Sequence, residues 1–141
     1  MVYNISNEEK ILKRVDFIGS SLEDLKKFPD EVKQDIGYAL FKAQQGLKPI
    51  RVKTLKGFGT GVLEIIENSI GGTYRAVYTV NFPEVVYVLH CFQKKSTRGI
   101  KTPRQDIELI KKRLRSAEEN YKTKEWRIKH ENKKSCLQGK R

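Results

Sequence analysis

Three runs of strand-forming residues follow one another between residues 62 and 93, and this succession constrains the fold more than any other feature. The runs span residues 62–67, 73–82 and 85–93 and are rich in Val, Ile, Tyr and Thr. The turn sequences at residues 68–72 and at Pro83-Glu84 separate them. Because short turns join antiparallel neighbours, the segment predicts a three-stranded antiparallel meander.

A short strand and a short helix are predicted before the meander. Residues 14–18 alternate in strand fashion, and Gly19 ends them. Ser20 and Glu23 match a capping box, which predicts a helix that continues to about Phe28.

A second helix follows directly, with Pro29 in its first turn and Gly46 as its C-terminal cap. Its apolar residues recur at helical spacing: Val32, Ile36, Leu40 and Ala43. The polar, basic and glycine-rich residues 47–61 predict a loop that carries function.

A third helix is predicted after the meander. Thr102 and Gln105 match another capping box, with Pro103 at the first helical position, and an apolar stripe extends to about Tyr121. The order strand, helix, helix, three strands, helix predicts an α+β domain with its helices on one face of a twisted antiparallel sheet of about four strands. The opening strand can join this sheet at an edge or in the middle.

The chain has 141 residues and a net charge of +12, and the charge is unevenly distributed. Residues 122–141 hold eight Lys/Arg and two Glu, which gives +6, and residues 1–121 hold 21 Lys/Arg and 15 Asp/Glu, which gives the other +6. We therefore predict one domain over residues 1–121 and a basic, flexible tail over residues 122–141. The basic balance favours polyanionic partners, although solubility alone also accounts for such a charge.

Membrane insertion and a disulfide framework are not expected. The longest apolar run, Val85–Phe92, has eight residues and contains His90. The N-terminal residues lack a hydrophobic signal segment, and the two cysteines have no metal-type spacing. We predict a cytoplasmic protein.

Common catalytic motifs are absent from the sequence: it has no Walker loop, GxGxxG, HExxH or CxxC. We expect neither a metal nor a cofactor. Of the two histidines, His90 lies in an apolar strand, where a packing or structural role is expected, and His130 lies in the tail. A ribonuclease based on two histidines is therefore not favoured.

Several cations cluster at strand ends and in the adjoining loops: Lys53, Lys56, Arg75, Lys94, Lys95 and Arg98. Metal-free RNA cleavage needs a base for the 2′-hydroxyl, charge stabilisation at phosphorus and an acid for the 5′-oxygen. Neighbouring like charges lower the pKa of a lysine and so fit it for proton transfer, while a fixed arginine stabilises charge. Solvated lysines at a sheet edge remain the commoner interpretation of such a pattern.

Four segments, in this order, resemble the phage-derived HigB-like toxins of the RelE/ParE superfamily. They carry FxxxSxxxLxxFPxEV, LKGFGxGVLEI, GTYRAVYTV and VYVLHxFQKKSxxGIxTPxxDIxLIKxRL, and they lie at Phe17–Val32, Leu55–Ile65, Gly72–Val80 and Val86–Leu114. The resemblance covers roughly residues 14–121. It implies a compact RelE-like fold and a toxin of a type II toxin–antitoxin pair that cleaves mRNA in the ribosomal decoding site.

The resemblance also implies roles for individual residues. The basic active-site positions of the family fall on Lys56, Arg75, Lys94 and Lys95. Arg75 is expected to stabilise the charge of the transition state. Lys94 is the first choice for proton transfer, with Lys95 or Lys56 as the second. RNA or ribosomal RNA backbone contacts are expected from three further cations: Lys53, Arg98 and Lys101.

Two alternatives stay open, and a departure from the family pattern suggests the second of them. Many RelE-like toxins carry another arginine on the strand before TYR, whereas Leu63–Glu67 has none. The alternatives are a ParE-like toxin that inhibits DNA gyrase without nuclease activity, and a non-catalytic remnant that binds an antitoxin or nucleic acid. The expected partners are mRNA on the ribosome and a cognate antitoxin, which is expected to be a helix-turn-helix protein.

Overall fold

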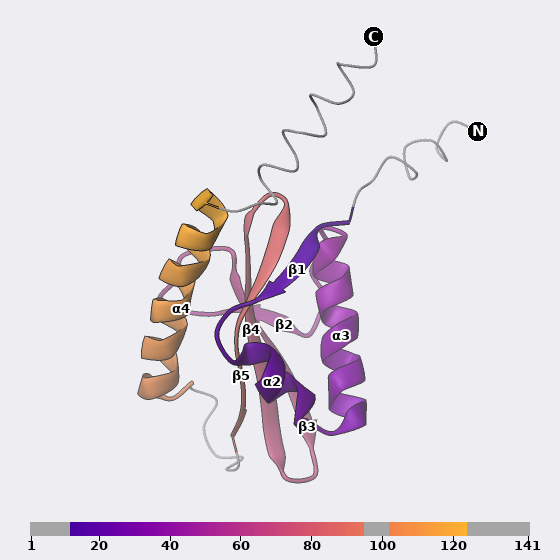
Figure 1. The fold of residues 1–141 in the computed structure, drawn as a ribbon. Helices are drawn as coiled ribbons and strands as arrows, with labels where there is room; N and C mark the ends of the chain where they lie inside the picture. Colours follow the sequence, from indigo (N-terminus) through magenta and orange to yellow (C-terminus); the bar gives the residue numbers. More distant parts are fainter. Residues whose placement is uncertain (1–11, 95–101, 124–141) are drawn as a thin grey trace, which may run out of the picture.

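The computed structural model describes residues 12–94 and 102–123 (Figure 1). The elements, in chain order, are β1 (Arg14–Phe17), α2 (Ser21–Lys26), α3 (Asp30–Gln44), β2 (Val52–Thr54), β3 (Val62–Ser69), β4 (Gly72–Phe82), β5 (Val85–Lys94) and α4 (Arg104–Thr123). The predicted α+β class and the predicted meander are confirmed. The last helix extends two residues beyond the predicted end at Tyr121 and so takes in the first residues of the predicted tail, whose remainder lies outside the described residues.

The sheet has five strands in the order β1-β5-β4-β3-β2. β2, β3, β4 and β5 pair antiparallel, whereas β1 lies at one edge and pairs in parallel with β5. The sheet is therefore mixed and has one strand more than predicted. The additional strand, β2, lies in the segment that was predicted to be a loop. Only Val52 of its three residues is buried, so the sequence there has no alternation of apolar and polar residues that would indicate a strand.

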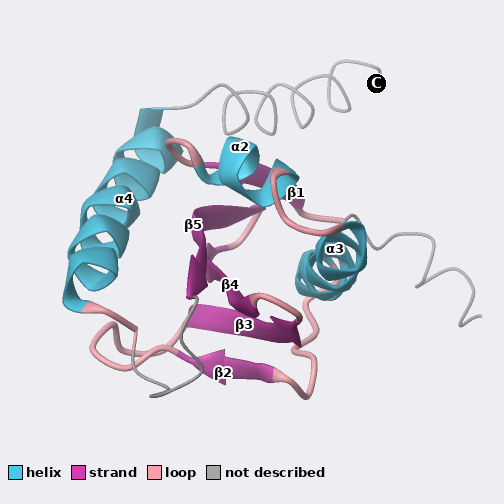
Figure 2. Ribbon diagram, turned by 90° about the horizontal axis from the view of Figure 1, so that it is seen from below, coloured by secondary structure: helices cyan, strands magenta, loops and turns pink. Residues whose placement is uncertain are grey.

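Helices cover both faces of the sheet, which corrects the prediction that they share one face (Figure 2). Alternate residues of β4 and β5 belong to two separate cores, because successive side chains of a strand point to opposite faces. Ala76 and Val88 pack with Ile36 of α3, on what we call the α3 face. Val77 and Leu89 pack with α4, on what we call the α4 face.

The predicted C-terminal cap of α3 is confirmed, whereas the predicted N-terminal capping boxes are not. Gly46, at φ +81°, follows α3 as predicted, and the amides of Gly46 and Leu47 donate to the carbonyls of Ala43 and Lys42, which is a Schellman motif. The two capping boxes do not form. The Ser20 hydroxyl donates to Asp24 (2.9 Å) rather than capping α2, and the Thr102 hydroxyl donates to Glu64 (3.1 Å). Pro29 and Pro103 each lie one residue before their helix rather than inside its first turn.

Within the residues that the structure describes, no helix combines the length and the apolar character that crossing a membrane would require.

Candidate active site

Three of the predicted site residues lie on the α4 face. Arg75 pairs with Phe92 of β5, Lys94 pairs with Thr73 one step further along the same face, and Lys53 pairs with Glu64. Phe92 packs against the α4-side core, and this fixes the side of the sheet on which they lie. The strand register therefore brings together three cations that are far apart in the sequence.

The other predicted residues divide into two groups. Lys56 is exposed in the turn after β2, beside Leu55, which is buried in the α4-side core. Lys95, Arg98 and Lys101 lie outside the described residues.

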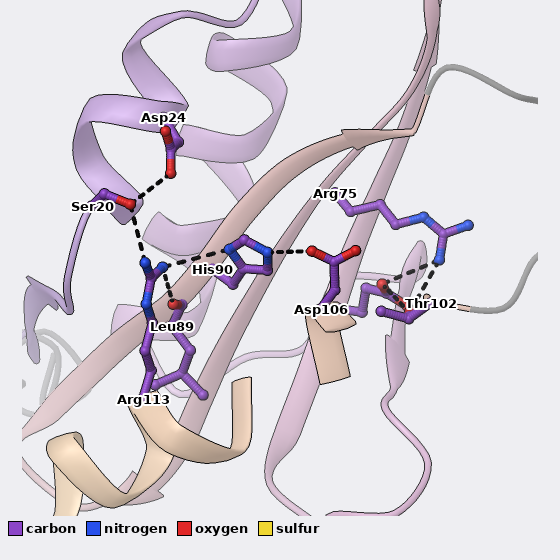
Figure 3. A network of polar contacts seen from close by, with 9 residues as sticks. Ser20, Asp24, Arg75, Leu89, His90, Thr102, Asp106 and Arg113 are labelled. Carbon is purple, nitrogen blue, oxygen red and sulfur yellow. Dashed lines mark hydrogen bonds and ion pairs between the residues drawn. The ribbon is translucent and has the colours of Figure 1, made fainter. Parts of the chain in front are cut away.

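Arg75 is buried and ion-paired. Its side chain is 2% exposed, and its Nη1 lies 3.2 Å from Oε2 of Glu64, whose side chain is 7% exposed. The same carboxylate oxygen accepts the hydroxyl of Thr102 at 3.1 Å, and Arg75 Nη1 also donates to that hydroxyl at 3.4 Å (Figure 3). A buried charge needs such a partner, and the partner is supplied by the neighbouring strand and by the residues just before α4.

This arrangement fixes the guanidinium. A buried arginine with a hydrogen-bonded carboxylate has few accessible rotamers, so its charge lies at a defined point in a low-dielectric environment. Such a preorganised cation is what electrostatic stabilisation of a phosphorane requires. Glu64 also lowers the net charge at that point, so a phosphate that approaches Arg75 competes with a carboxylate.

A second polar array crosses the same face. His90 Nε2 lies 2.7 Å from Oδ1 of Asp106, in the first turn of α4, and its ring stacks on Phe92 with the centroids 4.7 Å apart. On the other side of the ring, Arg113 Nη1 lies 3.5 Å from Nδ1 and donates to the carbonyl of Leu89 at 3.0 Å (Figure 3). His90 therefore has a structural hydrogen bond, as its strand position predicted.

A register shift produces this geometry. Val77 pairs with His90 and Tyr78 with Val88, which leaves Leu89 without a partner across the strand pair. The bulge turns both Leu89 and His90 toward α4. Gly19, at φ +59°, makes room for the arginine of α4, because a Cβ there would lie 2.8 Å from Nε of Arg113.

The sequence alone did not single out four members of these arrays: Glu64, Thr102, Asp106 and Arg113. One signal was available for Glu64: it is an acid within an apolar strand, as Arg75 is a base within the next one. The turn between the two strands sets their pairing and hence the side of the sheet that both occupy. Thr102 carried a misleading signal, because a threonine before proline also fits a helix cap.

Two other reactive groups on the sheet are buried and point away from this site. Burial raises the pKa of the Cys91 thiol to about 12, with Asp24 adding to the rise. Burial also raises the pKa of Tyr78 to about 12. Both belong to the α3-side core, so neither fits a role in chemistry on the α4 face. Among the described residues, no cluster of three metal-ligating side chains occurs.

Comparison with known proteins identifies the family. The family model described as "Phage derived protein Gp49-like" matches residues 23–115, and the chain belongs to this family. The predicted phage-derived family is thereby confirmed.

Two solved structures are similar to this chain. One is a mutant of the E. coli toxin RelE in the free state, with 21% identity, coverage of 59% of this chain and 84% of that chain, and a TM-score of 0.47. The other is the toxin–antitoxin complex RelBE2 from Mycobacterium tuberculosis, with 18% identity, coverage of 62% and 98%, and a TM-score of 0.42. Among curated proteins, none matches this chain.

Proposed function

We propose that this chain is the toxin of a type II toxin–antitoxin pair and that it cleaves mRNA on the ribosome. The observation that carries the proposal is the gathering of Lys53, Arg75 and Lys94 on the α4 face, with Arg75 held by the buried carboxylate of Glu64. Membership of the phage-derived family supports the toxin class.

The proposed reaction uses no metal. A base takes the proton of the 2′-hydroxyl, the 2′-oxygen forms a bond to phosphorus, and the bond from phosphorus to the 5′-oxygen breaks. An acid protonates the departing 5′-oxygen, and the products are a 2′,3′-cyclic phosphate and a 5′-hydroxyl. We assign proton transfer to Lys94, with Lys95 or Lys56 as the second group, and stabilisation of the phosphorane charge to Arg75.

The remaining cations are assigned to binding. Lys53 lies on the same face, at the edge strand, where it suits a phosphate of the RNA backbone. We assign the same role to Arg98 and Lys101. The ribosome is expected to position the message, so the isolated protein should cleave RNA weakly.

The partner and the cell compartment belong to the proposal as well. We propose that an antitoxin encoded beside this chain neutralises it, that the antitoxin has a helix-turn-helix domain, and that both act in the cytoplasm.

The test is induced expression in bacteria with 5′-end mapping of cellular mRNA. The informative variant is Lys94→Ala, because Arg75→Ala would leave the buried Glu64 without its partner and so confound activity with folding. Lys111→Ala is the matched control, since Lys111 lies on the outer side of α4 and pairs only with Glu108 of the same helix among the described residues. New cuts within translated messages, kept in Lys111→Ala and lost in Lys94→Ala, are expected.

Two other outcomes would contradict the proposal. Growth arrest with intact messages and blocked DNA supercoiling would indicate the gyrase-inhibiting alternative. Expression of wild type without growth arrest would indicate a non-catalytic binding protein.

A further inference from the structure

The loop between β2 and β3 has a distinctive backbone conformation. Gly57, Gly59 and Gly61 have φ values of +92°, +71° and +90°, whereas no residue other than glycine has a positive φ in the described part of the chain. The sign of φ therefore alternates at every residue from Lys56 to Gly61, a run that we call the glycine loop. Figure 2 shows the loop beyond the ends of both strands. Successive amides in alternating conformations of this kind form a concave donor surface for anions.

The amides of the glycine loop are available to a ligand. The amide of Leu55, just before the loop, donates to the carbonyl of Val62 at 2.9 Å. The amides of residues 56–61 donate to no acceptor among the residues that the structure describes. All six residues are exposed or half-buried, so water reaches these donors. A run of donors that the fold leaves to water is free to bind an anion instead.

Two of the glycines serve the backbone conformation alone. A Cβ at Gly61 would lie 1.8 Å from Oδ1 of Asn81, so close packing requires glycine there. A Cβ at Gly57 or Gly59 would meet nothing within 4 Å. At these two positions glycine is needed only for the positive φ, which residues with a side chain rarely adopt. The conformation of the donors is therefore what these glycines maintain.

A pocket opens beside the end of the glycine loop. Its volume is about 340 Å³, which lies at the lower end of the range of small-molecule sites. Polar side chains and an apolar floor line it, among them Lys13, Lys48, Thr54, Thr60, Ala43 and Leu63, and it has no carboxylate in its lining. Ala43 and Leu63 belong to the α3-side core, so the pocket lies on the face opposite Arg75 and Lys94.

The charge around the glycine loop has one sign. Residues 47–63 include four Lys/Arg and no Asp or Glu. Lys13 reaches the same pocket from the other side, and two hydrogen bonds fix its backbone: its amide donates to the carbonyl of Gln44 at 3.1 Å, and its carbonyl accepts from Nε2 of Gln44 at 2.7 Å. Cations without carboxylates between them attract an anionic ligand.

The end of α3 does not oppose such a ligand. A helix C-terminus carries a partial negative charge, because its last carbonyls have no partner within the helix. Here the carbonyls of Lys42, Ala43 and Gln44 accept the amides of Leu47, Gly46 and Lys13. These carbonyls are therefore satisfied where the helix borders the pocket.

We propose that the glycine loop and the adjoining pocket bind the phosphate monoester of a nucleotide-sized ligand. The loop amides and the Thr60 hydroxyl donate to the phosphate oxygens, Lys13 and Lys48 balance its charge, and the apolar floor receives the rest of the ligand. A phosphate monoester carries nearly two charges at neutral pH, whereas each phosphodiester of an RNA backbone carries one. The pocket also faces away from Arg75 and Lys94. The proposal does not depend on the proposed function.

The experiment reads binding at the amides themselves. The ¹H–¹⁵N NMR spectrum of the purified full chain is recorded during titration with a nucleoside 5′-monophosphate at constant ionic strength. Saturable shifts are expected for the amides of residues 57–61. The corresponding nucleoside and potassium chloride, which lack the phosphate, should leave them unchanged. If the monophosphate produces no saturable shift at these amides, the proposal is wrong.

Variants of Gly59 test the backbone conformation. Gly59→Ala should weaken binding by at least about tenfold, because alanine disfavours a positive φ and would turn amides away from the ligand. Gly59→Asn should bind within about twofold of wild type, since asparagine tolerates this conformation. Gly71→Ala is the matched control for backbone strain: Gly71 has φ +101° in the β3–β4 turn, and this variant should bind as wild type does. Equal affinities of Gly59→Ala and wild type would overturn the proposal.

A charge variant keeps the test independent of loop geometry. Thr60→Glu places a carboxylate beside the phosphate and should weaken binding by at least about tenfold. Gln34→Glu is the control, because it changes the net charge equally at an exposed position of α3 that does not line the pocket. It should bind as wild type does. The same affinity for Thr60→Glu and Gln34→Glu would contradict the proposed site.

An RNA arm distinguishes the two sources of phosphate. The probe is a 2′-O-methylated RNA oligomer without a terminal phosphate, which a reaction that needs the 2′-hydroxyl cannot cut. If the oligomer shifts the amides of residues 57–61 at lower concentration than the monophosphate does, the loop binds an RNA backbone and the nucleotide proposal is wrong. If only the monophosphate shifts them, the proposal stands. None of these readouts depends on cleavage, so the nuclease proposal is decided separately by Lys94→Ala.

Discussion

The two faces of the sheet differ in what they bury. The α3 face is closed by two helices over apolar side chains such as Ile36, Ala76 and Val88, with Glu67 at its margin. The α4 face is covered by one helix, and beside its apolar core it holds buried polar groups, Arg75 and His90 among them. Successive side chains of a strand point to opposite faces of the sheet, so one face can hold an apolar core while the other also holds polar groups.

The difference between the two faces shows where the fold accommodates buried polar groups. On the α4 face, Arg75 and His90 each have a carboxylate within hydrogen-bonding reach, that of Glu64 for Arg75 and that of Asp106 for His90. Taking an ion out of water costs several kcal/mol unless such a partner is present. The partners come from a neighbouring strand and from α4, so the helix that closes this face also completes its electrostatics.

The largest expected effect is at the buried ion pair. Arg75→Ala should lower the free energy of unfolding by about 3–5 kcal/mol, because Glu64 stays buried without its partner. The double variant Arg75→Met/Glu64→Leu should recover most of that loss. Arg14→Ala is the control, since Arg14 and Asp16 are also 3.2 Å apart but Arg14 is half exposed, and it should cost less than about 1 kcal/mol. Equal urea midpoints for Arg75→Ala and wild type would contradict this prediction.

A pair of buried isoleucines compares the two cores directly. Ile36 on the α3 face and Ile110 on the α4 face are both 0% exposed. Alanine at either position should cost about 3 kcal/mol, from lost burial and the cavity left behind. At a temperature where both variants remain folded, Ile36→Ala should still cleave mRNA, whereas Ile110→Ala should lose activity because α4 no longer holds the polar arrays. Equal activities would show that the α4 face does not depend on its helix.

Two buried tyrosines should respond with opposite signs. Tyr78 on the α3 face is fully buried, and its hydroxyl has no hydrogen-bond partner among the described residues. Tyr78→Phe should therefore raise the free energy of unfolding by about 1 kcal/mol. Tyr87 on the α4 face donates its hydroxyl to Asn120 at 2.7 Å, so Tyr87→Phe should lower it by about the same amount. Thermal melts that shift in the same direction for both variants would contradict the comparison.

The smallest effect is at Glu67, at the margin of the α3 face. Burial, and then the neighbouring Asp35, raise the pKa of the Glu67 carboxyl above its ordinary 4.5, while Arg51 opposes the rise. A pKa raised by folding means that stability is greatest below the unfolded pKa and is lost as pH rises through the folded pKa. Glu67→Gln should thus be more stable than wild type at pH 7, and the difference should vanish near pH 4. Denaturation curves across this range, with the exposed Glu108→Gln as control, provide the measurement.

Local patterns in the sequence predicted most of the elements. The turn at residues 68–72 and Pro83-Glu84 delimit three strands that the structure extends by only one or two residues. The stripe of α3 and the glycine after it predicted a helix that ends where Gly46 follows. These signals depend only on residues that are close together in the chain, so they can be recognised without knowledge of the fold.

The candidate site was predicted only in part. Arg75 and Lys94 were named from their positions near strand ends and from the family resemblance, and the register places both on one face. Their roles stay predictions. The partners of Arg75 were not foreseen, because Glu64 and Thr102 are 11 and 27 residues away from it and come together only through strand pairing and the start of α4.

The sequence by itself determined four of the strands, the helices and the basic character of the chain, since alternation, helical spacing, turn residues and charge are local properties. Only the tertiary structure decided that α4 covers the face opposite α3, that residues 52–54 form an edge strand, and that Arg75 is neutralised by Glu64. An amphipathic helix has one apolar stripe that fits either face of a sheet equally well. The choice between the faces depends on contacts between distant residues, and those contacts also settle which charges are buried together.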